Sequence, residues 1–353
     1  MRFSIGSHAI GPTEPLFVVA EIGLNHGGSL PVARAMIAAA ASAGASAVKF
    51  QTLHADTLVS AACPPPAHVT AASLRDFFRA FELSADAYAV LADDARRAGL
   101  AFLSTPFDEA AVDLLECAGC DAYKIASGDI THTALLRRVA ATGKPIVLST
   151  GMSGHAEIVS ALDTVRSAGG GPVALLHCVS VYPVPHDSQN LRAVAELADV
   201  YNVPVGLSDH STDPQAAVLA VALGATIYEK HFMLAGQTDA VDAAVSATPD
   251  QLAALIQSAR LACAALGDGR KQCLAAEAVN LTASRRSLYA QRDLRQGEVV
   301  TPGDVIALRP SAGLEPRQAR DLIGRVLARD VSAGGAFLEQ DLGDLAPRRT
   351  TDT

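Results

Sequence analysis

Residues 100–150 read LAFLSTPFDEAAVDLLECAGCDAYKIASGDITHTALLRRVAATGKPIVLST and contain one pattern three times. Each time, an apolar run ends in hydroxyl residues, and a stretch long enough for a helix leads to the next run. Runs that are apolar throughout, rather than alternating with polar residues, are typical of parallel strands covered on both faces. The segment therefore predicts the strand–helix units of a parallel α/β fold.

Further runs of the same kind lie on both sides of this segment. The complete set is FVVAE (17–21), SAVKFQ (46–51), LAFLST (100–105), DAYKIAS (121–127), KPIVLST (144–150), PVALLHC (172–178), VPVGLSDH (203–210) and ATIYEKH (225–231). Eight such units predict a (β/α)8 TIM barrel. Because catalysis in this fold takes place at the C-terminal strand ends, the last residues of each run are candidate site residues.

The pattern changes after about residue 266, where the chain becomes polar and irregular. We expect a barrel domain over 1–266, a linker over 267–282, a small β-rich module over 283–345 and a disordered tail over 346–353. Inside the module, the spacing of Arg292 and Asp304 recurs as Arg329 and Asp341. This echo predicts a short internal duplication.

Composition narrows the class of protein. The net charge of −9 argues against a nucleic-acid partner, which would require a basic surface. Since no apolar stretch of about 20 residues and no signal-like N-terminus occur, we expect a cytoplasmic protein without a membrane partner. The pair Cys117 and Cys120 lacks the second pair of a structural zinc site, so buried free thiols are expected. Cys178 is interpreted as a small core residue.

Lysine is rare, with five lysines against twenty-three arginines. Two of the five, Lys49 and Lys124, lie at predicted strand ends, where a compact point charge suits phosphate oxygens. Strand alternation turns Lys230 away from the barrel interior, so a structural role is predicted for it, as for Lys144. The alternative for Lys49 and Lys124 is that both simply reach solvent.

Two histidines end the seventh and eighth runs, which are neighbours in a closed barrel. His210 and His231 fall on the inward face, together with Ser208 and Glu229. Two converging imidazoles can bind a divalent ion such as Mn, Fe, Co or Zn, although a hydrogen-bonded histidine pair is the alternative. His26 and His177 are weaker candidates, and His177 is expected in the core.

Hydroxyl residues gather at the same strand ends. They are Ser104, Thr105, Ser127, Ser149, Thr150, Ser180 and Ser208. Together with two lysines and glycine-containing turns, they predict a cradle for phosphate oxygens. A metal site beside such a cradle indicates a phosphorylated substrate and an electrophile that a metal activates.

Eight ordered motifs carry a family resemblance over residues 14–343. They are AEIGLNHGG, KFQT, STPFD, YKIASGD, KPIVLSTGMS, LLHCVSVYP, GLSDHS and EKHF, followed by RRSLYA and ALRP. The chain thereby resembles the sialic acid (N-acetylneuraminate) synthase family, a barrel followed by an antifreeze-like (SAF, β-clip) module. The resemblance implies condensation of phosphoenolpyruvate with an N-acylated mannosamine-type sugar and water, giving a nonulosonic acid and phosphate. It also implies Mn2+ (or Mg2+ or Co2+) and a homodimer with a domain-swapped SAF module.

The resemblance also implies roles for individual residues. The phosphoenolpyruvate ligands would be Lys49, Gln51, Thr105, Lys124, Ser127, Ser149, Ser180 and Ser208. The metal would be bound by His210 and His231, and the sugar by Glu21, Tyr182, Glu229 and Asp242, with Arg309 reaching the N-acyl group in the partner's site. Asp129 would orient or deprotonate the attacking water, or cap the following helix.

Several alternatives stay open. The segments 60–72 and 238–246 depart from the family pattern, so the acceptor is open among the neuraminate, legionaminate and pseudaminate series, with AEIGLNHGG and KFQT favouring the first two. A Schiff-base aldolase would use Lys124 as an imine-forming nucleophile without a metal. A non-catalytic polysaccharide- or coat-assembly protein on the same fold is the third possibility.

Overall fold

The computed structural model describes residues 1–64 and 71–345. The tail predicted over 346–353 and part of the 60–72 segment lie outside the described residues. The chain divides into two compact units, Met1–Asp268 and Gly269–Thr353. Each unit is described by itself.

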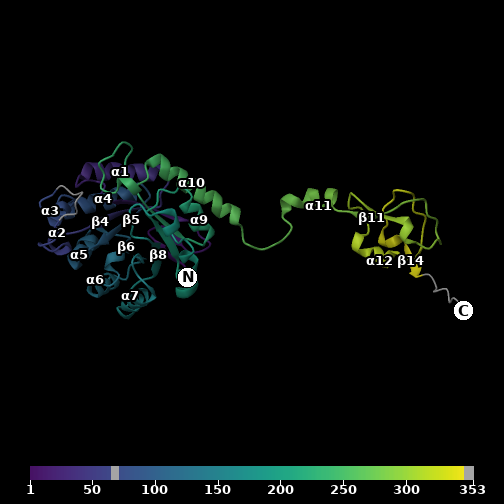
Figure 1. Ribbon diagram of the computed structural model, residues 1–353, viewed down its shortest axis with the longest axis horizontal. Helices are drawn as coiled ribbons and strands as arrows, with labels where there is room; N and C mark the ends of the chain where they lie inside the picture. The colour runs from purple at the N-terminus through teal and green to yellow at the C-terminus, as the bar shows by residue number, and fades with distance from the viewer. Residues whose placement is uncertain (65–70, 346–353) are drawn as a thin grey trace. The chain divides into compact units, whose positions relative to one another are not determined.

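Eight parallel strands of the first unit form a closed barrel, as predicted (Figure 1). They are β3 (Phe17–Gly23), β4 (Ala47–Thr52), β5 (Ala101–Pro106), β6 (Ala122–Ile125), β7 (Ile146–Ser149), β8 (Val173–Cys178), β9 (Val205–Asp209) and β10 (Ile227–His231). Closure occurs between the last strand and the first, where His231 pairs with Glu21 in register. Two residues far apart in the chain thus meet at the same end of the barrel.

Helices surround the strands, as expected for βα units (Figure 1). They are α1 (Leu30–Ser42), α2 (Ala55–Leu58), α3 (Leu74–Arg79), α4 (Ala85–Arg97), α5 (Glu109–Ala118), α6 (Thr133–Ala140), α7 (His155–Ser167), α8 (Ala193–Tyr201), α9 (Ala216–Ala222) and α10 (Pro249–Leu266). Helix α1 has a typical start: the Ser29 hydroxyl accepts a hydrogen bond from the Val32 amide, and a proline lies in the first turn. Among the described residues, no helix has both the length and the apolar character needed to cross a membrane.

Strand alternation separates the apolar side chains of the first unit into two cores. The larger core lies between strands and helices and includes Val18, Val48 and Phe102. The smaller core fills the barrel interior, where Phe17, Val19 and other inward residues pack together. The hairpin of β1 (Phe3–Ile5) and β2 (His8–Ile10) adds Ile5 and Ile10 to this interior cluster, so its floor is apolar.

The second unit consists of two short antiparallel pairs. Strand β11 (Ser287–Ala290) pairs with β12 (Val305–Leu308), and β13 (Arg325–Leu327) pairs with β14 (Leu342–Leu345). The predicted duplication has a clear basis: Arg292 forms an ion pair with Asp304, and Arg329 forms the equivalent pair with Asp341. The same unit contains the helix α12 (Ala319–Leu322).

Two sequence expectations need correction. Helix α11 (Ala278–Ser284) lies partly inside the span predicted as an irregular linker. Cys120 is buried, as expected, but Cys117 is exposed because it lies on the outer face of α5. All six cysteines are free thiols.

Candidate active site

The candidate site lies inside the barrel at the C-terminal ends of the strands, next to the apolar cluster that forms the barrel floor. On each strand, alternate residues point inward, and the last inward positions are polar. A cavity of about 430 Å³ opens there, and its lining includes Glu21, Lys49, Gln51, Thr105, Lys124, Ser127, Ser149, Cys178, Ser180, Tyr182, Ser208, His210, Glu229, His231 and Asp242. Thus fourteen of the sixteen predicted site residues line one cavity, and Asp129 and Arg309 do not.

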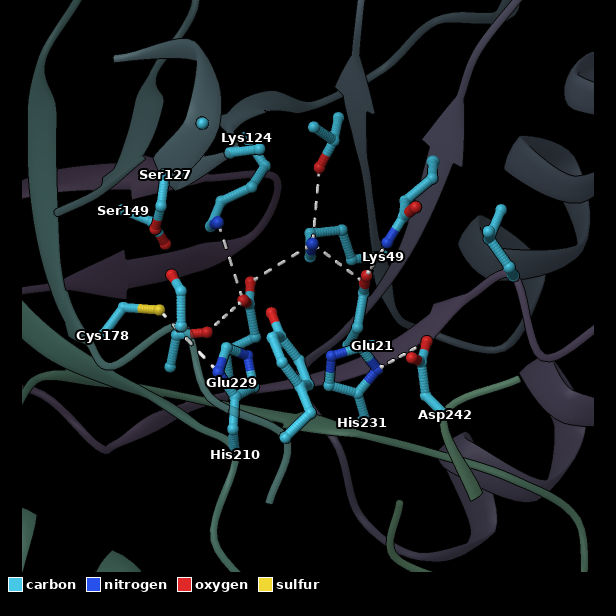
Figure 2. A pocket seen from close by; sticks show the side chains of 18 of the residues that line it. Glu21, Lys49, Lys124, Ser127, Ser149, Cys178, His210, Glu229, His231 and Asp242 are labelled. Atoms are coloured by element: carbon cyan, nitrogen blue, oxygen red, sulfur yellow. Dashed lines mark hydrogen bonds and ion pairs between the residues drawn. The ribbon is translucent and has the colours of Figure 1, made fainter. Parts of the chain in front are cut away.

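Two lysines and two glutamates form a buried charge network at the centre of the cavity (Figure 2). Lys49 Nζ lies 3.0 Å from Glu21 Oε2 and 3.7 Å from Glu229 Oε2. Lys124 Nζ lies 3.6 Å from the other oxygen of Glu229. All four side chains are nearly inaccessible, with residue exposures of 2–4 %. Pairing therefore offsets the high cost of burying these charges.

Neutral groups hold the network in place. Gln51 donates a hydrogen bond of 3.0 Å to Glu21 Oε1, and Ser208 donates one of 2.8 Å to Glu229 Oε1. Lys49 donates to the Thr105 hydroxyl at 3.3 Å. The residues in these contacts come from five strands, so the barrel itself sets their geometry.

The network shifts the pKa values of its members. Burial alone would raise the pKa of Glu229, but Lys124 and Lys49 outweigh it and lower that pKa to about 2. Burial lowers the pKa of Lys124, with Lys49 adding to the effect and Glu229 opposing it. Burial would also lower the pKa of Lys49, but Glu21 and Glu229 outweigh it, so this pKa is raised. Glu229 is consequently ionised at neutral pH.

Ser127, Ser149 and Ser180 line one side of the cavity. In Figure 2, Ser127 and Ser149 lie on the side away from Asp242. The Ser149 hydroxyl is buried and has no hydrogen-bond partner within the described part of the chain. A Cβ at Gly151 would lie 2.4 Å from the Ser180 hydroxyl and 2.7 Å from that of Ser127. The glycine therefore leaves room for oxygen-rich groups beside an unpaired hydroxyl.

Two of the seven hydroxyls expected in the cradle are placed elsewhere. Ser104 faces away from the barrel interior and bonds to Thr52 and the Phe50 carbonyl. Thr150 donates to the Leu176 carbonyl. Both occupy outward positions next to an inward hydroxyl residue, so strand alternation explains the correction.

The histidine rings lie close together at the neighbouring ends of β9 and β10. Their centroids are 5.4 Å apart, and the ring of Tyr182 stacks on His210 at 4.1 Å. His210 Nδ1 lies 2.9 Å from the Val179 carbonyl, and His231 Nδ1 lies 3.3 Å from Asp242 Oδ2. A carbonyl or carboxylate at Nδ1 orients an imidazole so that Nε2 can bind a metal.

The donor set therefore fits a divalent ion of which the protein supplies only part of the coordination shell. Among residues 1–64 and 71–345, no three His, Cys, Asp or Glu side chains are grouped as a metal site. Two imidazoles leave coordination positions for substrate or water, which is a property of catalytic rather than structural sites.

Two predicted site residues lie apart from the cavity. Asp129 ends the turn Ser127–Asp129 after β6, where burial raises the pKa of its carboxyl group. It does not cap the following helix, because α6 has His132 as its N-cap. Arg309 belongs to the second unit, where it is exposed just after β12. Its role stays a prediction.

Sequence reasoning missed part of the lining. Cys178 is not a simple core residue: its thiol lies in the cavity, 3.9 Å from His210 Nδ1. Burial would raise the pKa of this thiol, but His210 outweighs it and lowers the pKa. Phe77 and Phe78 of α3 also line the cavity and add an aromatic wall. Strand alternation could have identified Cys178, which lies two residues after the inward Leu176.

Two structural assignments are confirmed. Lys230 faces outward, as alternation requires, and its Nζ lies 3.1 Å from Asp209 Oδ2 in a buried ion pair. His177 is buried on the outer face of β8, with Nε2 2.8 Å from the Gln189 carbonyl. Neither residue lines the cavity.

Comparison with known proteins identifies the family. Residues 36–271 match the NeuB family model, and residues 285–343 match the SAF domain model. The chain belongs to the NeuB family. The expected resemblance to sialic acid synthases and the expected barrel-plus-SAF fold are both confirmed.

Several members of this family are similar along nearly their whole length. N,N'-diacetyllegionaminic acid synthase of Legionella pneumophila is 36 % identical, with 93 % of this chain and 95 % of the relative covered. Pseudaminic acid synthase of Campylobacter jejuni is 34 % identical, with coverage of 92 % and 96 %. The solved N-acetylneuraminic acid synthetase of Leptospira borgpetersenii superimposes with a TM-score of 0.73 at 33 % identity, covering 80 % of this chain and 95 % of that one.

Proposed function

We propose that this protein condenses phosphoenolpyruvate with an N-acylated mannosamine-type sugar and water, forming a nonulosonic acid and releasing phosphate. The observation that carries the proposal is one cavity with two buried lysines beside a serine cradle and two histidines. The relatives named as legionaminic and pseudaminic acid synthases support this substrate class. The neuraminate, legionaminate and pseudaminate series are equally supported as products.

Phosphoenolpyruvate would bind in the half of the cavity that contains the serines. Its ligands would be Lys49, Gln51, Thr105, Lys124, Ser127, Ser149, Ser180 and Ser208. Charge-assisted bonds from the two lysines suit carboxylate and phosphate oxygens, and the Ser149 hydroxyl is free to donate to one of them.

A divalent ion, Mn2+ or alternatively Mg2+ or Co2+, would be held by His210 and His231. When bound, it would polarise the aldehyde oxygen of the open-chain sugar. Charge balance favours such an ion, because Glu21, Glu229 and Asp242 outnumber the two cavity lysines. A phosphate ester entering this cavity would otherwise add further negative charge.

The reaction would form a C–C bond and break a C–O bond. The enol carbon of phosphoenolpyruvate attacks the aldehyde carbon, and positive charge develops at the carbon that bears phosphate. The ionised Glu229 stabilises this charge electrostatically. Water then adds to that carbon, and the tetrahedral intermediate loses phosphate by C–O cleavage.

Asp129 is proposed as the residue that orients or deprotonates the water. Partial burial raises the pKa of its carboxyl group, which makes the carboxylate a stronger base. Replacement by Asn tests this role: kcat should fall with little change in either KM, whereas unchanged kcat would exclude it.

The sugar would be contacted by Glu21, Tyr182, Glu229 and Asp242. We propose that Arg309 of a second subunit binds the N-acyl group through a domain-swapped homodimer. Light scattering would measure the subunit number, and Arg309→Ala should raise the KM for the sugar more than that for phosphoenolpyruvate.

The direct test is phosphate release from phosphoenolpyruvate with a panel of N-acylated hexosamines, with and without a chelator. We expect acceptor-dependent release that the chelator abolishes and Mn2+ restores. A Schiff-base aldolase is the second candidate, favoured by the lowered pKa of Lys124. Borohydride with pyruvate would then trap a covalent adduct at Lys124. No release with any acceptor would favour a non-catalytic assembly role.

A further inference from the structure

Asn25, in the loop after β3, is a buried polar residue outside the cavity lining. It is only 1 % exposed, yet it uses both of its donors and its acceptor. Nδ2 donates to the Phe232 carbonyl and to the Ser246 hydroxyl, each at 2.9 Å. Oδ1 accepts from the Asp242 amide at 2.9 Å. Because a backbone N–H can only donate, this last contact sets the orientation of the amide group.

These bonds hold both backbone groups of Asp242. Asn25 accepts from the Asp242 N–H directly, and it reaches the carbonyl through Ser246, whose hydroxyl donates to the Asp242 oxygen at 2.7 Å. The backbone carbonyl of Asn25 also accepts a hydrogen bond from the side chain of Gln237. Thus one asparagine joins the loop after β3 to three positions of the segment after β10, in addition to the end of that strand.

The segment held in this way needs such support. Between the end of β10 at His231 and the start of α10 at Pro249, its described regular structure is one short turn, Ala243–Val245, and an isolated bridge between Phe232 and Ala247 at the two ends of the segment. The Asp242 carboxylate lines the cavity and lies 3.3 Å from His231 Nδ1. The position of that carboxylate therefore depends on bonds from outside the segment.

We propose that Asn25 is a positioning residue that fixes the Asp242 carboxylate at the acceptor side of the cavity. This inference rests on the proposed function only in assigning Asp242 to the sugar. Asn25 does not touch substrate. It acts by holding the Asp242 backbone, so its loss should weaken sugar binding and leave phosphoenolpyruvate binding nearly intact.

The test compares Asn25→Ala, Ser246→Ala and the double variant with Ser29→Ala. Ser29 lies in the same loop, but its hydroxyl caps α1 by accepting a hydrogen bond from the Val32 amide. We expect Asn25→Ala to raise the KM for the sugar by at least about tenfold, with the KM for phosphoenolpyruvate within about twofold. Ser246→Ala should have a smaller effect, and the double variant should be less than additive because both residues hold Asp242. Ser29→Ala should lower the melting temperature without this selective change.

Hydrogen–deuterium exchange supplies a readout that needs no activity. In Asn25→Ala, amides of residues 234–246 should exchange faster, while those of β4 and β5 keep their wild-type rates. Equal increases in both KM values, or unchanged exchange in 234–246, would overturn the proposal. If the wild type releases no phosphate with any sugar, the proposed function fails, and the exchange result still decides whether Asn25 holds the Asp242 segment.

Discussion

Lys124 Nζ lies 3.6 Å from Glu229 Oε1, and both side chains are buried inside the barrel. The pair joins the end of β6 to the end of β10, and Lys49 approaches the same glutamate from β4. Such a network is costly to bury and contributes little net stability compared with an apolar core. We therefore attribute it to the binding of an anionic substrate rather than to folding.

Removing the Lys124 charge should strongly impair catalysis. We expect Lys124→Met to lower kcat/KM for phosphoenolpyruvate by roughly 10²–10³-fold, because a buried cation that would bind the carboxylate or phosphate oxygens of this substrate is lost. Steady-state phosphate release measures the effect. Lys144→Met is the matched control, since Lys144 forms an ion pair with Glu116 outside the cavity, and it should stay within about twofold of wild type. Comparable losses in the two variants would contradict the assignment.

The activity should have an alkaline limit set by Lys124. Burial lowers the pKa of this lysine, so the charged form is lost at a lower pH than for an ordinary lysine. We expect kcat/KM for phosphoenolpyruvate to fall before pH reaches the ordinary lysine pKa of about 10.4. In Lys124→Arg the residual activity should keep its plateau to higher pH, since arginine does not deprotonate. An alkaline limit unchanged in Lys124→Arg would show that another group titrates.

The absence of a side chain at Gly151 should be essential for binding of phosphoenolpyruvate, because Gly151 packs against the serine hydroxyls. A Cβ there would lie 2.4 Å from the Ser180 hydroxyl, whereas one at Gly128 would meet nothing within 4 Å. Gly151→Ala should raise the KM for phosphoenolpyruvate by about tenfold or more, because the serines must move from their positions. Gly128→Ala, at a glycine that lines the cavity, should behave like wild type. Equal KM values in the two variants would disprove the steric argument.

Acid should destabilise the protein partly through His26. Burial lowers the pKa of His26 to about 4, against 6.5 for the free side chain. Between these values the unfolded chain binds the additional proton, so the free energy of unfolding rises with pH from about 4 to 6.5. This histidine should contribute about 3 kcal/mol to that rise.

His26→Asn removes the titration and can keep an acceptor for the Gly28 amide, which donates to His26 Nδ1 in the wild type. Urea unfolding at pH 4.5 and 6.5 measures the difference. The variant should lose a smaller part of its stability on acidification. An equal loss in both proteins would assign the acid sensitivity to other groups.

Much of the barrel and its lining could be predicted from strand alternation. Period-two spacing places Glu229 and His231 inward and Lys230 outward, and all three lie as expected. The same rule explains why Ser104 and Thr150 point away from the cavity and why Cys178 lines it. The predictions for these three residues followed residue type instead of strand position. Applied strictly, alternation separates lining from structural residues on each strand.

Other features could not be predicted because they depend on contacts that are distant in sequence. Asn25 bonds to Phe232, Asp242 and Ser246, which lie 207 to 221 residues away. The aromatic wall from Phe77 and Phe78 depends on how α3 packs beside the strand ends. Local sequence patterns do not indicate such contacts. The side of the cavity near Asp242 was therefore harder to predict from the sequence than the side with the lysines and serines.

The central claim is metal-dependent condensation at His210 and His231, and one measurement tests it most directly. Phosphate release from phosphoenolpyruvate and N-acylated hexosamines is compared in wild type and in a His210→Ala, His231→Ala double variant, with Mn2+ binding followed by electron paramagnetic resonance. We expect the double variant to stay folded, to bind no Mn2+ and to lose acceptor-dependent release. Release at the wild-type rate by the double variant would contradict it.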